Sequence, residues 1–141
     1  MGALILDDIA DGALLLLDSP PIIYVLEHHP VFSHRFLPLF KAQAEGRVNF
    51  AVTTVGIAEV LTGPLRVPDE PLARRFRAIM ESWHVVPLDS AVAESAARLR
   101  ASLRLKLPDA VQLASALTIN ADALVTHDRD FSGVRSLRII C

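Results

Sequence analysis

The sequence predicts an α/β fold in which a parallel sheet of short strands is covered by helices on both faces. Strand-like and helix-like segments alternate along the whole chain of 141 residues, and this alternation is typical of parallel sheets. The strand-like segments are short and apolar throughout, as expected of strands buried on both faces. The sequence contains no internal repeat and no low-complexity linker, so we expect a single domain.

Runs of apolar and β-branched residues predict the strands. The first run consists of four leucines and ends at Asp18, and the second run is rich in strand-forming residues. The five expected strands span residues 14–17, 48–52, 85–88, 123–126 and 137–140.

Helix signals fill the intervals between these strands. Pro20 and Pro21 suit the first turn of a helix through 22–26, and apolar residues at helical spacing follow from Phe32 until Gly46. Each later helix is expected to begin at a capping residue or a proline: Thr53 or Thr54, Asp69, Asp89 or Ser90, and Pro108. The helix after Thr53 or Thr54 is expected to end at about residues 63–64.

Composition excludes several classes of protein. Apolar residues make up 52% of the chain, so intrinsic disorder is excluded. The apolar run at 13–17 is far shorter than the roughly 20 residues of a membrane span, and the acidic N-terminus lacks the positive charge of a secretory signal. The only cysteine, Cys141, cannot form an intramolecular disulfide, which fits a reducing cytoplasm. The net charge of −2 disfavours a protein that coats nucleic acid.

Four acidic residues stand where packing would favour apolar ones. Asp18 directly follows the leucine run, Asp128 follows the fourth expected strand, and Glu59 and Asp109 lie in otherwise apolar helix starts. Ligands of such sheets bind at the carboxyl ends of the strands. Converging carboxylates repel one another unless a cation neutralises them, and hard oxygen ligands select Mg²⁺ or Mn²⁺. The sequence therefore predicts an acidic metal site at this edge.

Each acid except one has a simple structural alternative. Asp109 can complement its helix dipole, Asp128 can be a turn residue, and Glu59 can pair with an arginine. Asp18 has no evident local structural need, so it argues most strongly for a site. Asp130 is expected to cap a short turn or helix before the next aromatic residue.

At these residues the sequence resembles the PIN-domain ribonucleases, and in particular the VapC-type toxins of bacterial toxin–antitoxin pairs. Four stretches carry the resemblance: LLDSPPIIYVLE (16–27), AEVLTGPLR (58–66), RLKLPDAVQLASA (104–116) and ADALVTHDRDF (121–131). The resemblance implies a three-layer α/β/α PIN-like fold with a central, mostly parallel sheet of four to five short strands. The PIN domain would span residues 13–141, after an N-terminal extension at 1–12.

The resemblance also implies a metal-dependent endoribonuclease that hydrolyses phosphodiester bonds with a metal-activated water. The catalytic acids of the family correspond here to Asp18, Glu59, Asp109 and Asp128. Asp18, Asp109 and Asp128 would bind Mg²⁺ or Mn²⁺, and Glu59 would orient a water. The expected supporting groups are Ser19, Thr126 and Asp130. Where the family often has a polar residue two positions after its first acid, this chain has Pro20, and Ser19 would supply a hydroxyl instead.

The resemblance further implies an RNA substrate, a homodimer, a cognate VapB-type antitoxin, a cytoplasmic location and no membrane association. The cations nearest to the acidic motifs in sequence are candidates for binding RNA phosphates: Arg98, Arg104, Lys106 and Arg129. Each of these side chains could equally well lie on a solvated helix face without binding RNA. Trp83 is expected in the core, and a turn role is favoured for His127.

Three other classes of protein also place acids at the ends of parallel strands or share the PIN-like fold. A phosphatase of the haloacid-dehalogenase type needs a second aspartate two residues after the first, where this chain has Pro20. A response-regulator receiver needs a lysine after a late strand, but the only lysines are Lys41 and Lys106. A catalytically silent PIN-like binding module stays open as the alternative, although all four acids are present.

Overall fold

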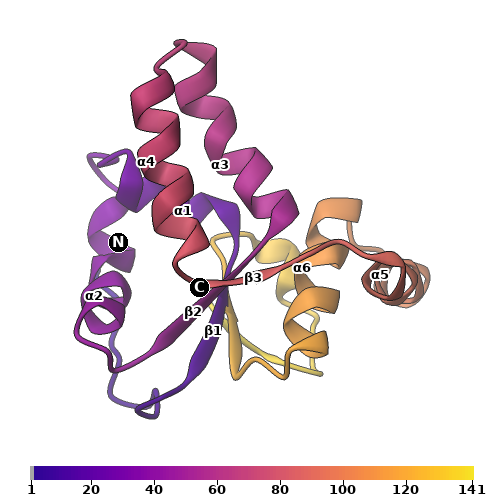
Figure 1. Ribbon diagram of the computed structural model, residues 1–141. Coiled ribbons are helices and arrows are strands. Elements are labelled where there is room, and N and C mark those ends of the chain that lie inside the picture. Colours follow the sequence, from indigo (N-terminus) through magenta and orange to yellow (C-terminus); the bar gives the residue numbers. More distant parts are fainter. Residues whose placement is uncertain (1) are drawn as a thin grey trace.

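A parallel sheet of five strands forms the middle layer of the structure, a computed structural model that describes residues 2–141 (Figure 1). The strands lie in the order β3-β2-β1-β4-β5, and every neighbouring pair is parallel. Their bounds are β1 (Leu14–Leu17), β2 (Asn49–Thr53), β3 (His84–Val86), β4 (Ala123–Val125) and β5 (Arg138–Ile140). The parallel α/β fold predicted from the sequence is confirmed.

Helices cover both faces of the sheet. Their bounds are α1 (Ser19–Leu26), α2 (Ser33–Ala44), α3 (Thr54–Arg66), α4 (Glu70–Glu81), α5 (Ser90–Leu103), α6 (Leu107–Thr118) and the short 3₁₀ helix η1 (Arg129–Phe131). Helices α3 and α4 pack side by side, and so do α5 and α6 on the other side of the sheet (Figure 1). Among residues 2–141, no helix combines the length and apolar character that a membrane crossing requires.

The leucine run of β1 shows why the sheet needs helices on both faces. Leu15 and Leu17 point into the core formed with α1 to α4, whereas Leu16 points into the core formed with α5 and α6. All three side chains are almost completely buried. Alternate residues of a strand face opposite sides, so a strand that is apolar at every position buries both of its faces. Trp83 lies in the first of these cores, as expected.

Side-chain caps begin most of the helices, as the sequence indicates. Asp18, Thr53, Asp69 and Asp89 each accept a hydrogen bond from a backbone N–H in the first turn of the following helix. One boundary differs from expectation, because α3 continues through Pro64 to Arg66. Proline inside a helix removes one N–H donor and crowds the carbonyl four residues earlier, but the buried Pro64 lies near the end of α3, where only two more residues follow in the helix.

The segment before β1 packs against the domain. Leu4, Leu6 and Ile9 are half-buried against the core that contains α1 to α4. The Arg35 guanidinium in α2 donates to the backbone carbonyls of Gly2 and Cys141, so it links the two ends of the described chain. Arg138 in β5 forms an ion pair of 2.8 Å with Asp8. The residues predicted as an extension therefore contact α2 and β5.

Candidate active site

The predicted acids come from different elements that meet at the carboxyl-terminal edge of the sheet. Asp18 follows β1 directly, Asp128 lies three residues beyond the end of the adjacent strand β4, and Asp109 lies in the first turn of α6. The charges of Asp128 and Asp18 both act on Asp109, and that of Asp18 acts on Glu59 in α3. The structure thus brings the four acids into one neighbourhood.

Asp18 is a buried carboxylate whose orientation is fixed by three donors. Its Oδ1 accepts hydrogen bonds from the backbone N–H of Ser19 (2.9 Å) and from Nε2 of Gln112 (3.0 Å). Its Oδ2 accepts from the Thr126 hydroxyl (2.9 Å). Burial raises the pKa of Asp18, and the nearby charge of Asp128 adds to this effect, while the three hydrogen bonds oppose it. A carboxylate offers about four acceptor positions, so one position on Oδ2 stays available.

Gln112 and Thr53 belong to the site through hydrogen bonds that lead to Asp18, and the sequence did not predict this role for either residue. Gln112 on α6 has no solvent-exposed surface, and its Oε1 accepts a hydrogen bond of 2.7 Å from the Thr53 hydroxyl. Thr53 ends β2 and was expected only as a helix cap, a function that it also performs by accepting from the N–H of Gly56. The available sequence signal was a glutamine inside the apolar stretch of α6.

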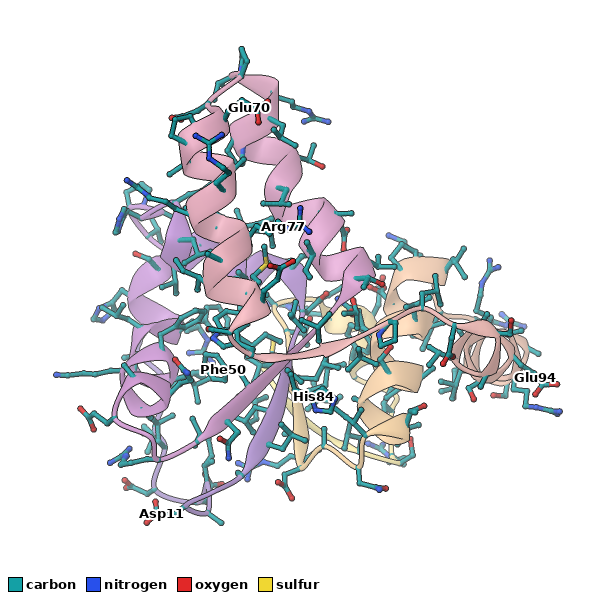
Figure 2. The ribbon with its side chains drawn as sticks, in the orientation of Figure 1. Asp11, Phe50, Glu70, Arg77, His84 and Glu94 are labelled. Carbon is teal, nitrogen blue, oxygen red and sulfur yellow. The ribbon has the colours of Figure 1, made fainter. Side chains whose placement is uncertain are left out.

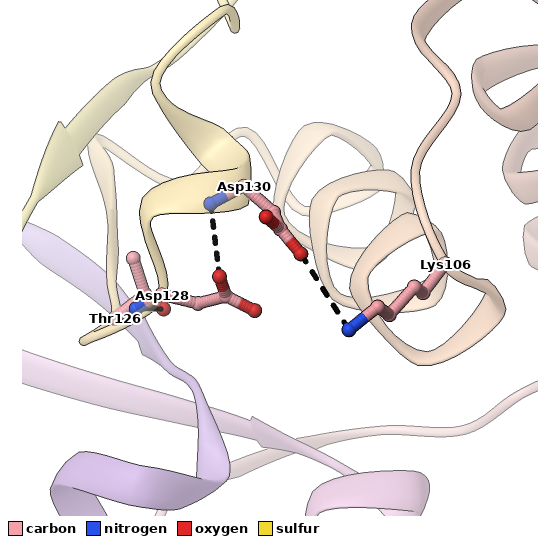
Figure 3. A network of polar contacts seen from close by, with 4 residues as sticks. All are labelled: Lys106, Thr126, Asp128 and Asp130. Carbon is pink, nitrogen blue, oxygen red and sulfur yellow. Dashed lines mark hydrogen bonds and ion pairs between the residues drawn. The ribbon is translucent and has the colours of Figure 1, made fainter.

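Asp109, Asp128 and Asp130 form the tightest group of carboxylates in residues 2–141. One oxygen from each lies within 4.8 Å of the others, a spacing that a single metal ion can bridge. Asp128 Oδ1 accepts from the N–H of Asp130 (2.8 Å), and Asp130 Oδ2 lies 3.8 Å from Nζ of Lys106 (Figure 3). Asp18 lies outside this group, whereas Asp130, expected only as a supporting residue, lies within it.

Asp109 is the acid most perturbed by its surroundings. Burial, followed by the charges of Asp128 and Asp18, raises its pKa to about 7. Its Oδ2 is buried and has no hydrogen-bond partner among the described residues. A buried carboxylate oxygen without a donor is costly to the fold unless a proton or a cation occupies the position.

Glu59 belongs to the site through Ser19 rather than through the close acidic group. Its Oε1 accepts a hydrogen bond of 3.0 Å from the Ser19 hydroxyl. Burial and the charge of Asp18 raise the pKa of Glu59, and the bond from Ser19 opposes that effect. The Ser19 hydroxyl expected to assist Asp18 is thus directed to Glu59, and Asp18 is bound by the Ser19 backbone instead.

The four predicted RNA-binding cations are distributed unevenly. Lys106 lies beside Asp130, and Arg129 lies in η1, where its charge helps to lower the pKa of His127 after the larger effects of burial and Arg35. Arg104, the residue directly after α5, adopts the left-handed conformation and is exposed. Arg98 instead forms an exposed pair with Glu94 on α5 (3.5 Å), and Figure 2 shows Glu94 at the outer edge of the molecule.

His127 connects the acidic site to an aromatic cluster. Its Nδ1 lies 3.1 Å from the Tyr24 hydroxyl. Its ring also makes edge contacts with Phe32 and Phe36, with ring centres 4.8 and 5.7 Å apart. His127 therefore fixes the path of the chain between Thr126 and Asp128 by packing against α1 and α2.

Two sequence expectations about helix caps require correction. Asp18 does have a local structural function, because its side chain caps α1. The cap of η1 is Asp128 and not Asp130, since Asp128 is the residue before the helix and accepts from the N–H two positions later. In both cases the cap forms because the carboxylate lies in extended backbone directly before the first turn.

Comparison with protein families gives one match that covers most of the chain. Residues 15–137 match the PIN domain. Among curated proteins, none matches this sequence.

Solved structures share the fold over nearly the whole chain. A chain from a toxin–antitoxin complex of Klebsiella pneumoniae superimposes with a TM-score of 0.71 and 22% identity, covering 90% of this chain and 96% of that one. A chain from the VapBC2 complex of Rickettsia felis, bound to a promoter DNA fragment, gives 0.69 and 17%, covering 89% and 96%. A Sarcin-Ricin loop cleaving VapC toxin of Mycobacterium tuberculosis gives 0.67 and 17%, covering 88% and 98%.

Proposed function

The chain belongs to the PIN-domain family, and from this premise we propose that it is a divalent-metal-dependent endoribonuclease that acts as the toxin of a toxin–antitoxin pair. The observation that carries the proposal is the group formed by Asp109, Asp128 and Asp130, with Asp18 beside it. Three carboxylates within 4.8 Å of one another repel strongly unless a cation or a proton separates them.

The residues present fit a divalent ion. The donor set consists of carboxylate oxygens only, which suits Mg²⁺ or Mn²⁺ rather than a softer metal. The buried Oδ2 of Asp109 lacks a partner, so a ligand position is available there. We propose Asp109, Asp128 and Asp130 as the residues that hold the ion, together with the free position on Asp18 Oδ2. This set adds Asp130 to the three ligands that the resemblance implies.

When bound, such an ion would activate a water and neutralise the charge that develops at the phosphate during hydrolysis. The protein's own residues orient the reacting groups. Three donors keep Asp18 in one orientation. Glu59, bound by the Ser19 hydroxyl, keeps its second oxygen available to orient a water or accept its proton. Lys106 and Arg129 lie beside the acids and are proposed to bind phosphates of the RNA strand.

The partners are proposed from the structural relatives. The Klebsiella and Rickettsia structures are toxin–antitoxin complexes, and the Mycobacterium toxin cleaves the Sarcin-Ricin loop. We propose by analogy that this chain cleaves RNA, forms a homodimer in the cytoplasm and is inhibited by a VapB-type antitoxin.

An RNA cleavage assay tests the activity. The purified protein, freed of any bound antitoxin, is expected to cleave single-stranded RNA with Mg²⁺ or Mn²⁺ and to stop when EDTA is added. Asp69→Asn is a control substitution that should leave RNA cleavage unchanged. Asp69 caps α4 away from the site, and asparagine is an equally good cap. A protein that binds its antitoxin but cleaves no RNA with either metal would be the silent binding module instead.

A further inference from the structure

Gln112 is a buried amide whose hydrogen bonds connect the acidic site to the neighbouring strand. It has no exposed surface, and its close neighbours along α6 are apolar or small. Its Nε2 donates to Asp18 Oδ1 at 3.0 Å, and its Oε1 accepts from the Thr53 hydroxyl at 2.7 Å. Packing alone does not require an amide at this position, because methionine has a similar volume and no polar group to desolvate.

The contacts at both ends of the side chain fix which way the amide points. Thr53 Oγ1 accepts the N–H of Gly56, so its single proton is free to be donated to Gln112 Oε1. In the flipped orientation, Oε1 would face the Asp18 carboxylate, and two acceptors would repel each other. The chain of donors therefore runs in one direction, from Gly56 through Thr53 and Gln112 to Asp18.

Asp18 is thus held from the strands on both sides of β1. Thr126, directly after β4, donates to Oδ2, and Thr53, at the end of β2, acts on Oδ1 through Gln112. Removing Gln112 would leave Thr126 and the Ser19 N–H as the only described donors to Asp18.

We propose that Gln112, oriented by Thr53, is a positioning residue of the reaction: it holds the Asp18 carboxylate so that the open position on Oδ2 faces the acidic group. The inference rests on the proposed ribonuclease activity. Gln112 acts through Asp18 and contacts neither metal nor RNA. Groups that orient metal-site carboxylates in this way change metal affinity or activity by about 10–100-fold when removed.

The test compares matched substitutions at the two glutamines of the chain, Gln112 and Gln43. Gln112→Met keeps the volume and removes the amide, and Gln43→Met makes the same change on α2 at the other end of the sheet. We expect Gln112→Met to lower kcat for RNA cleavage by about 10–100-fold. The KM for RNA should stay within about threefold, because Gln112 does not contact RNA, and Gln43→Met should retain wild-type kcat. An unchanged kcat for a folded Gln112→Met protein would overturn the proposal.

A second pair of variants keeps the proposal testable if Gln112→Met does not fold. Thr53→Ser retains the hydroxyl and the helix cap, so it should keep kcat near the wild-type value. Thr53→Val keeps the shape but removes the hydroxyl, and with it both the bond to Gln112 and the cap of α3, and in the folded protein it should reproduce the loss expected for Gln112→Met. Equal kcat for folded Ser and Val variants would contradict the proposal, because the hydroxyl would then have no effect on the site.

Nuclear magnetic resonance gives a readout that does not depend on turnover. The chain has two glutamines and two asparagines, so only four side-chain NH₂ pairs are expected. The pair from Gln112 should exchange slowly with water, shift in Asp18→Asn and broaden first when Mn²⁺ is added. Rapid exchange of this pair would exclude the hydrogen bond to Asp18. Wild-type protein without cleavage or Mn²⁺ binding would instead refute the proposed ribonuclease, even if the Gln112 pair exchanged slowly.

Discussion

Asp18 combines a structural and a chemical function at a single position. It caps α1 through the N–H of Ser19, and it presents to the site a carboxylate that is held by Gln112 and Thr126. An aspartate directly after a buried leucine run was recognisable in the sequence as a site residue. Of its side-chain partners, Thr126 was expected as a supporting group from the family resemblance, whereas Gln112, 94 residues away along the chain, was not predicted.

Asp18→Asn is expected to lower the rate of RNA cleavage by at least about 100-fold and to change the free energy of unfolding by less than about 1 kcal/mol. Asparagine keeps the cap and the shape, and relief of repulsion with Asp128 offsets the weaker hydrogen bonds. Urea unfolding and cleavage assays on the same sample measure both quantities. A large loss of stability would mean that the charge of Asp18 serves mainly the fold.

Asp109 makes the stability of the metal-free protein depend on pH. Its pKa is raised from 3.8 to about 7 in the folded state, chiefly by burial, so the folded protein binds more protons than the unfolded chain between these values. The free energy of unfolding in EDTA should therefore fall as the pH rises from about 4 to 7, by about 1–3 kcal/mol from this residue.

Asp109→Asn should remove most of this decrease, because asparagine carries no ionisable proton. Unfolding in urea at pH 5 and pH 7.5 provides the comparison. Wild type and variant losing stability in parallel would show that Asp109 ionises normally in the fold.

At the scale of the elements, caps and strand ends were the most predictable features. The leucine run gave β1 with both of its boundaries, and Thr53, Asp69 and Asp89 were among the expected caps that the structure contains. The end of α3 was predicted about two residues too early. A proline near the end of a helix can either terminate the helix or lie within its last turn.

The turn after β4 also shows where sequence reasoning reaches its limit. Asp128 and Asp130 are both acidic and lie two residues apart, so the sequence could rank them only by resemblance to a motif. Because η1 begins at Arg129, its turn brings both carboxylates toward Asp109, and a local 3₁₀ helix of three residues has no clear sequence signature.

Substitution of either acid should therefore weaken metal binding. Asp128→Ala is expected to lower Mn²⁺ affinity by at least about 100-fold, because it removes a ligand and the cap of η1 together. Asp130→Ala should cost about 10–100-fold. Isothermal titration calorimetry provides the affinities, with Asp69→Ala as a control that removes a cap far from the site. Wild-type affinity in Asp130→Ala would exclude Asp130 from the ligand set.

At the scale of the whole molecule, the segment before β1 is expected to stabilise the fold. Leu4, Leu6 and Ile9 each bury part of an apolar side chain, worth about 1 kcal/mol apiece, and Arg35 adds contacts to Gly2. Deleting residues 1–12 should lower the free energy of unfolding by about 2–4 kcal/mol.

Asp8→Ala is the control for that deletion, because it removes only an exposed ion pair with Arg138, worth less than about 1 kcal/mol. Urea unfolding compares the two proteins with the full chain. A truncated protein as stable as the full chain would show that the segment packs without contributing to stability.

We propose that the group of Asp109, Asp128 and Asp130, with Asp18 beside it, holds the divalent ion that RNA cleavage requires. The most direct test follows Mn²⁺ binding and RNA cleavage together, over the same range of Mn²⁺ concentrations, in wild type and Asp109→Asn. We predict that wild type reaches half-saturation of binding and half-maximal cleavage at the same concentration, and that Asp109→Asn shifts both upward by at least about tenfold. Cleavage that persists undiminished in EDTA, or that is independent of Mn²⁺ while binding is saturable, would contradict the account.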